Sequence, residues 1–106
     1  LQALMWPDGK LSPQAIGQSA ATIAQRAGLA PAGAPPAMLL VEESGTGPAH
    51  PFSGEKLSPV LTVYRARDLA DAQAIVARIY AFMGAGHSVS LHTAQPDRAL
   101  ALALAL

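Results

Sequence analysis

The stretch "PVLTVYRARDLADAQAIVARIYAFMGAGHSVSLHT" (residues 59–93) decides the fold class. Its first segment, 59–65, is rich in β-branched and aromatic residues and predicts a strand. Residues 68–83 repeat apolar side chains at helical spacing after Asp68, whose side chain suits an N-cap. Residues 87–93 alternate polar and apolar side chains, which indicates a second strand with one covered face. A strand, a helix and a strand in this order predict a βαβ unit with parallel strands, so the fold class is α/β.

The residues upstream and downstream predict two further helices and one further strand. Ser12 and Pro13 suit the N-cap and the first turn of a helix, and Gly28 suits its C-terminal stop. The short apolar run 38–42 predicts a buried strand. Pro96 favours the first turn of a last helix, over an alternation of Ala and Leu that would also fit a strand.

The composition indicates a single domain at most, with few charges. The chain has 106 residues, a formal net charge of zero and 13% charged residues, against roughly 25% in an ordinary soluble domain. This balance offers no basic surface for nucleic acid. The low charge favours a piece whose faces are covered by other protein. Because the chain starts on Leu1 within an apolar stretch and ends on an apolar run, we expect a fragment of a longer polypeptide.

Two sequence features speak against a membrane protein. No apolar run reaches the roughly 18 residues that a spanning helix needs. The N-terminus lacks the basic and then apolar pattern of a signal peptide. The chain also has no cysteine, which excludes disulfides and thiolate metal sites within it. We therefore expect a cytoplasmic protein.

Glycine and histidine motifs in the chain do not predict a phosphate or metal site. Gly84 and Gly86 form a G-x-G, but Val89 stands where a third glycine of a dinucleotide loop is needed, and the motif follows a helix instead of a strand. In a strand, His87 and His92 point to opposite faces. With no carboxylate at a useful spacing, we expect no metal site.

The irregular segment 43–54 leads into a carboxylate and an amine at Glu55 and Lys56. Long loops in compact domains are often functional. The residues alone also allow the plainer interpretation that Glu55 and Lys56 are an ordinary solvated pair. His87 follows a glycine turn at the start of a predicted strand, where α/β folds place their sites; a hydrogen-bonded turn histidine fits at least as well.

Three stretches resemble the CoA-acylating branch of the aldehyde dehydrogenase superfamily: "EKLSPVL" (55–61), "VYRARDLADAQAIV" (63–76) and "GAGHSVSLHT" (84–93). That branch includes the acetaldehyde dehydrogenase half of bifunctional aldehyde-alcohol dehydrogenases and the sulfoacetaldehyde and succinate-semialdehyde acylating enzymes. The likeness extends over essentially the whole chain. It implies that residues 1–106 are a C-terminal-side part of the catalytic domain, with the dinucleotide-binding domain and the cysteine-bearing segment absent from this chain.

The resemblance implies roles for three residues. Glu55, in an E-x-L-x-P-V pattern with Leu57, Pro59 and Val60, matches the family's glutamate that contacts the nicotinamide-side ribose. A carboxylate suits this role because it can accept hydrogen bonds from both ribose hydroxyls. Leu57 takes the place of the apolar residue that packs near the nicotinamide. His87 matches the histidine of the acylating branch's "GH(T/S)" motif, near the catalytic cysteine, with positioning or proton transfer as its role.

The implied reaction converts an aldehyde, CoA and NAD or NADP to an acyl-CoA and the reduced cofactor through a cysteine thiohemiacetal and thioester. Since the chain has no cysteine, we expect it to be inactive and marginally folded on its own. The full-length protein is expected to be a homo-oligomer that binds a small aldehyde and CoA. Two alternatives stay open, namely a stand-alone α/β binding module or pseudoenzyme, and a non-acylating aldehyde dehydrogenase.

Overall fold

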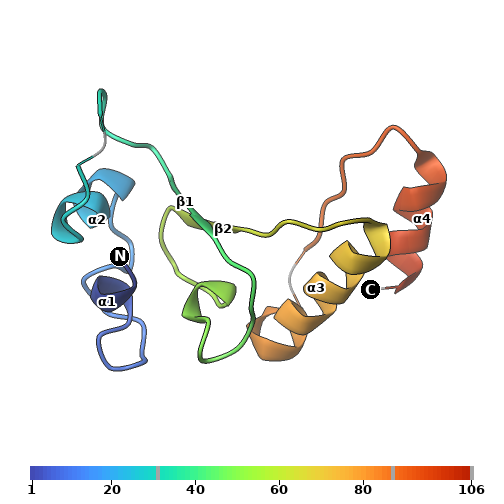
Figure 1. The fold of residues 1–106 in the computed structure, drawn as a ribbon, viewed down its shortest axis with the longest axis horizontal. Helices are drawn as coiled ribbons and strands as arrows, with labels where there is room; N and C mark the ends of the chain where they lie inside the picture. The colour runs from blue at the N-terminus through green and yellow to red at the C-terminus, as the bar shows by residue number, and fades with distance from the viewer. Residues whose placement is uncertain (31, 87, 106) are drawn as a thin grey trace.

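The chain folds as a mixture of helices around a short parallel sheet, which confirms the α/β class. The computed structural model describes residues 1–30, 32–86 and 88–105. Figure 1 shows the helices distributed along the molecule, with the two strands between them. In chain order the elements are α1 (Gln2–Met5), α2 (Ala20–Arg26), β1 (Leu39–Glu42), the 3-10 turn η1 (Pro51–Ser53), β2 (Val60–Val63), α3 (Leu69–Ile79), the π-type turn η2 (Tyr80–Gly84) and α4 (Pro96–Ala105).

The sheet pairs β1 with β2 in parallel, in a register that sets Leu39 beside Val60 and Glu42 beside Val63. Both strands were expected from the sequence, and each is slightly shorter than its predicted range. Parallel neighbours need a long crossover between them. Here the segment 43–59, with η1 inside it, makes the connection. This crossover carries the residues of the candidate site.

One face of the sheet packs on the N-terminal helices and forms the core. Burial of apolar side chains is the main stabilising contribution there. The rings of Trp6 and Phe52 meet edge to face, with centroids 4.9 Å apart, an arrangement that aromatic pairs favour. The opposite face of the sheet is exposed, and β1, expected to be a buried strand, shows 67% of Leu40 to solvent. The buried cluster consists of Met5, Ala15, Ile23, Phe52 and Val60.

The first long helix begins later than the sequence predicts. Ser12 was expected to be its N-cap, but α2 starts at Ala20, and the side chain of Ser19 accepts a hydrogen bond from the Thr22 N–H. Gly17 interrupts the predicted helix, because its φ of +67° is a left-handed conformation. The C-terminal stop at Gly28 is confirmed, also by a left-handed φ of +71°.

The prediction of a strand at 87–93 is wrong for residues 88–93, which the structure describes. Residues 88–93 form no strand, and the predicted βαβ unit therefore has no second strand. A strand is held by hydrogen bonds to a neighbour, and within the described part of the chain only β1 and β2 pair. His87 lies outside the described residues. The parallel pair comes instead from the two strands that flank the loop at 43–59.

Both C-terminal helices form as predicted, but the first is shorter: α3 ends at Ile79, and the π-type turn η2 follows, in which Met83 has a non-helical backbone. Asp68 caps α3 by accepting a hydrogen bond from the Asp71 N–H at 2.8 Å, and Pro96 begins α4. Of the two structures that fit the Ala/Leu alternation, the helix is the one formed. None of the helices within residues 1–30, 32–86 and 88–105 has the length and apolar character that a membrane span requires.

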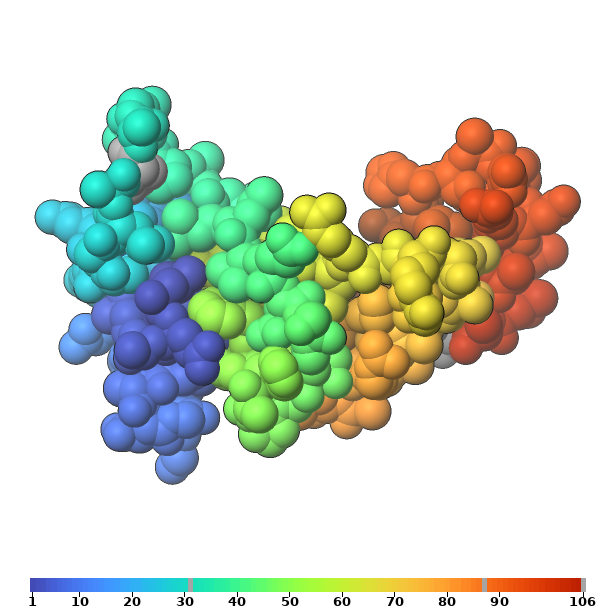
Figure 2. Space-filling view, in the orientation of Figure 1, coloured from blue at the N-terminus to red at the C-terminus, as the bar shows by residue number. Residues whose placement is uncertain are grey.

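The molecule is elongated, with extents of 44 × 32 × 23 Å. Its radius of gyration is 15.6 Å, whereas a compact domain of this length has about 13 Å. Figure 2 shows residues 1–30 at one end, α3 and α4 toward the other, and the crossover loop between them. The chain therefore buries less of its surface than an ordinary domain of its size.

Candidate functional site

Glu55 projects from the segment between η1 and β2, and its side chain is exposed. Its carboxylate makes no hydrogen bond or ion pair within the described residues. It stands at the rim of a groove of about 400 Å³, whose wall includes Leu61, Tyr80 and Met83. Glu55 is thus an unpaired carboxylate beside a partly apolar hollow.

Leu57 has a strained backbone conformation. Its φ is +46°, the only positive φ of a non-glycine residue in the described chain. Such a conformation costs about 1–3 kcal/mol, and it persists where the surroundings hold it in place. Here the Leu57 carbonyl accepts a hydrogen bond from the Gly17 N–H at 2.9 Å. The side chain of Leu57 is 54% exposed.

Lys56 points inward, in contrast to Glu55. Its Nζ donates to the carbonyl oxygens of Phe52 and Gly54, both at 2.8 Å. Burial lowers the pKa of Lys56 from its ordinary value of 10.5. The interpretation of residues 55 and 56 as a solvated pair is therefore wrong for Lys56, which is half-buried and hydrogen-bonded to the loop.

Gly54 lies directly against the η2 turn. A Cβ atom at this position would stand 2.8 Å from the Met83 sulfur and 3.3 Å from Cε1 of Phe82. The φ of Gly54 is −95°, which any residue can adopt, so it is space and not backbone freedom that favours glycine here. The loop that carries Glu55 thus packs closely on the C-terminal end of the long helix.

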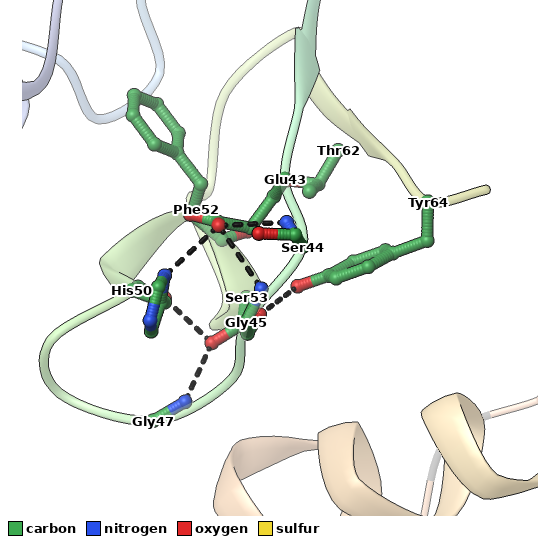
Figure 3. A network of polar contacts seen from close by, with 9 residues as sticks. All are labelled: Glu43, Ser44, Gly45, Gly47, His50, Phe52, Ser53, Thr62 and Tyr64. Carbon is green, nitrogen blue, oxygen red and sulfur yellow. Dashed lines mark hydrogen bonds and ion pairs between the residues drawn. The ribbon is translucent and has the colours of Figure 1, made fainter.

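The first half of the crossover is held by the carboxylate of Glu43, as Figure 3 shows. One of its oxygens accepts hydrogen bonds from the Ser44 N–H at 2.8 Å and the Gly45 N–H at 3.1 Å, and lies 2.9 Å from Nδ1 of His50. The Gly45 N–H, together with the Ser44 N–H and His50, lowers the pKa of Glu43 from its ordinary value of 4.5. This carboxylate folds the loop back on itself.

Ser53 and Tyr64 complete the network in Figure 3. The buried Ser53 hydroxyl donates to the His50 carbonyl at 2.6 Å and accepts from the Gly47 N–H at 3.0 Å. The Tyr64 hydroxyl donates to the Gly45 carbonyl at 2.8 Å. Burial, followed by the negative charge of Glu43, raises the pKa of Tyr64 above its ordinary value of 10.0. The crossover is a densely hydrogen-bonded loop.

The structure brings together only part of the predicted site. Glu55 and Leu57 lie on one loop, but Leu57 is not among the residues that line the groove beside Glu55. His87 lies outside the described residues, so its distance from Glu55 stays untested. Of the remaining histidines, His50 belongs to the Glu43 network and His92 is exposed. Within the described residues, no group of three or more potential metal ligands comes together.

Three residues that support the site were missed from the sequence. Lys56 and Gly54 hold the loop as described above, and Thr62 on β2 donates its hydroxyl to the Phe52 carbonyl. A lysine between a glutamate and a leucine in a loop carries no local pattern that predicts burial. For Thr62, its place on the covered face of a predicted strand was the available signal.

The residues around Glu55 fit the ribose of a nicotinamide cofactor. An ionised carboxylate accepts hydrogen bonds and donates none, so its two oxygens suit two neighbouring hydroxyls. The apolar wall at Leu61 and Met83 suits a flat ring. The hydroxyl of Ser58, in the same loop, is buried and has no hydrogen-bond partner within the described chain.

Sequence and structure comparisons find relatives of one kind, acylating aldehyde dehydrogenases. No protein-family model matches the chain. It is 63% identical to the sulfoacetaldehyde dehydrogenase (acylating) of Cupriavidus necator over 103 residues, which cover 96% of this chain and 21% of the relative. It is 42% identical to the sulfoacetaldehyde dehydrogenase (acylating) of Bilophila wadsworthia, covering 84% and 20%. The crystal structure of an acetylating aldehyde dehydrogenase from Geobacillus thermoglucosidasius superposes with a TM-score of 0.87 at 28% identity, covering 94% of this chain and 22% of that one.

Over nearly its whole length, the chain matches one segment of the acylating aldehyde dehydrogenases. Sequence and structure agree on this, because the superposition extends over the same part of the chain as the sequence identity. The family resemblance expected from residues 55–61, 63–76 and 84–93 is confirmed. The chain spans about a fifth of the length of the relatives it matches.

Proposed function

We propose that the protein carrying this chain oxidises an aldehyde to an acyl-CoA, with NAD(P)⁺ as the oxidant and CoA as the acyl acceptor. In this proposal the chain is a C-terminal-side part of the catalytic domain. The cysteine nucleophile and the dinucleotide-binding domain belong to other parts of the protein, because this chain contains no cysteine.

Glu55 is the residue that carries the proposal. It combines an unpaired, exposed carboxylate with a firmly anchored loop, inside the E-x-L-x-P-V pattern. We assign it to the ribose hydroxyls on the nicotinamide side, which it would hold in a defined orientation. Leu57 is exposed but does not line the groove beside Glu55, so its packing near the nicotinamide is proposed from the family motif alone. The bound cofactor supplies the hydride acceptor, and His87 is proposed to position or move a proton near the nucleophile.

Sulfoacetaldehyde is the aldehyde that we propose as substrate. The support is that two relatives, 63% and 42% identical to this chain, are sulfoacetaldehyde dehydrogenases (acylating). Bifunctional aldehyde-alcohol dehydrogenases are less similar, for example that of Escherichia coli at 34% identity. The preference for NAD or NADP and the formation of a homo-oligomer stay predictions.

The test is an assay of the complete gene product with sulfoacetaldehyde and NAD⁺ or NADP⁺, with and without CoA. The proposal expects cofactor reduction that depends on CoA and forms an acyl-CoA. Reduction that proceeds equally without CoA, with free acid as the product, would indicate the non-acylating alternative. No reduction, with no binding of cofactor, would favour the binding module or pseudoenzyme.

Replacing Glu55 tests the assigned role. Glu55→Gln removes the negative charge and keeps the shape, so we expect the KM for the cofactor to rise roughly ten-fold or more, since hydrogen bonds to charged groups are worth about 1.5–3 kcal/mol. Glu42→Gln is the matched control, because Glu42 is exposed on β1 and pairs with Arg65. Equal cofactor KM values in the two variants would contradict the role of Glu55.

A further inference from the structure

Lys56, the residue after Glu55, makes hydrogen bonds that affect the orientation of the backbone at Glu55. We propose that Lys56 is a positioning residue, which orients the backbone at Glu55 toward the cofactor by holding the carbonyls of Phe52 and Gly54. This inference rests on the proposed function, because it concerns the same ribose-binding carboxylate.

The first step of the argument is the peptide unit between Gly54 and Glu55. A peptide bond is planar, so the Gly54 carbonyl and the Glu55 N–H belong to one rigid unit. The Lys56 ammonium is 2.8 Å from that carbonyl oxygen. Lys56 therefore fixes the plane from which the Glu55 side chain departs.

The second step is the connection to the core. The same ammonium donates to the Phe52 carbonyl at 2.8 Å, and that carbonyl also accepts from the Thr62 hydroxyl on β2. The ring of Phe52 is buried against Trp6. The orientation of Glu55 is thus tied through Lys56 to a packed ring and to the sheet.

The third step is that Lys56 leaves the carboxylate available. Glu55 is exposed while Lys56 is half-buried. No ion pair joins them within the described residues. Lys56 acts on Glu55 through the backbone and does not neutralise the charge that would bind the ribose.

The chemistry of lysine fits this task. An ammonium carries three donors on one small centre, so one nitrogen reaches two carbonyls that lie close together. A planar guanidinium spreads its donors over a rigid fork and fits the same two carbonyls less well. The left-handed Leu57 follows immediately, so the segment between Gly54 and Leu57 is held on both sides, by Lys56 and by Gly17.

The experiment uses the complete gene product and measures the dissociation constant for NAD⁺ or NADP⁺ without substrate. Lys56→Met removes the donors and keeps the length of the side chain; we expect roughly ten-fold weaker cofactor binding, because small displacements of a positioning group are costly. The control is Arg98→Met, which also replaces an exposed cationic side chain by methionine, on α4 and outside the hollows beside Glu55, and is expected to bind as the wild type does. Lys56→Arg keeps charge and donors and is expected to be intermediate, and it replaces the methionine variant if that one fails to fold.

A double-mutant cycle with Glu55→Gln separates positioning from a general loss of structure. If Lys56 acts through Glu55, Lys56→Met weakens binding in the wild-type background and changes little when Glu55 is already Gln. Hydrogen exchange of residues 52–58 in the cofactor-free protein gives a second readout, and Lys56→Met is expected to accelerate it.

The outcomes distinguish the inference from the proposed function. If the wild type binds the cofactor and Glu55→Gln weakens binding, but Lys56→Met binds like the wild type or loses the same factor in both backgrounds, the positioning role is refuted and the proposed function stands. If the wild type does not bind the cofactor, or Glu55→Gln binds it equally well, the ribose role of Glu55 fails and the inference fails with it.

Discussion

The buried hydroxyl of Ser53 gives the sharpest prediction on how the crossover loop is held. Ser53→Ala removes one hydrogen bond to the His50 carbonyl and one from the Gly47 N–H. The His50 carbonyl keeps a second donor, the Ser53 N–H at 2.9 Å. The Gly47 N–H keeps none within the described chain. The substitution therefore orphans one backbone donor and only weakens the other contact.

The magnitude follows from that count. An orphaned buried donor costs about 1–3 kcal/mol, and Gly47 is only half-buried, so the lower part of that range applies. A loss of about 1–2 kcal/mol in the free energy of local opening corresponds to roughly 5–30-fold more frequent opening. Hydrogen exchange in the complete protein measures this for peptides that cover residues 43–54.

Ser44→Ala is the control, because Ser44 is exposed in the same loop and its hydroxyl makes no hydrogen bond within the described residues. We expect its exchange to match that of the wild type. Equal protection of the loop in the Ser53 and Ser44 variants would refute the reasoning, since the buried hydroxyl would then contribute nothing to holding the loop.

Three further predictions concern the loop and the chain as a whole. Gly54→Ala sets a methyl group against the Met83 sulfur, so we expect a loss of roughly 1 kcal/mol that Met83→Ala largely cancels; additive effects in thermal unfolding of the complete protein would argue otherwise. Because the pKa of Glu43 is lowered from 4.5, its ionised form stabilises the fold above that pH, and this contribution is lost as the pH falls through the lowered pKa. The difference in thermal stability between the wild type and Glu43→Gln should therefore shrink on acidification; an unchanged difference would exclude this role. The isolated 106-residue chain should lack a cooperative thermal transition, because an apolar face of its sheet is exposed; calorimetry showing one sharp transition would contradict this.

Local patterns were sufficient where one segment decides its own structure. Asp68 caps α3 as predicted. An N-cap needs only a side-chain oxygen that accepts a hydrogen bond from the backbone N–H three residues later. The two strands at 38–42 and 59–65 were found from their composition and their flanking breakers. The place of Glu55 in the loop that leads into β2 also followed from the sequence, and the family resemblance carried by its motif is confirmed by the relatives.

Local patterns failed where a distant residue decides. Both Ser12 and Ser19 suit an N-cap, and Ser19 is chosen because Gly17 turns left-handed and donates its N–H to Leu57. Residues 88–93 have the alternation of a strand, but within the described chain no neighbouring strand supplies the ladder. Neither the choice of N-cap nor the missing strand can be predicted from the sequence of its own segment.

For this protein, the sequence by itself determined the class of fold and most of its helices and strands. It also determined the motif that carries the family resemblance, since all of these depend on side-chain type and spacing along the chain. Only the tertiary structure decided that Lys56 turns inward while Glu55 stays exposed, without an ion pair or hydrogen bond to the described residues. Two carbonyls of the η1 turn meet the lysine ammonium, and the path of the backbone, set by Phe52 in the core and Thr62 on β2, brings them there. Glu55 and Lys56 are adjacent charged residues in one loop, so the local sequence does not say which side chain is buried. That depends on contacts that form only when the loop closes on the sheet.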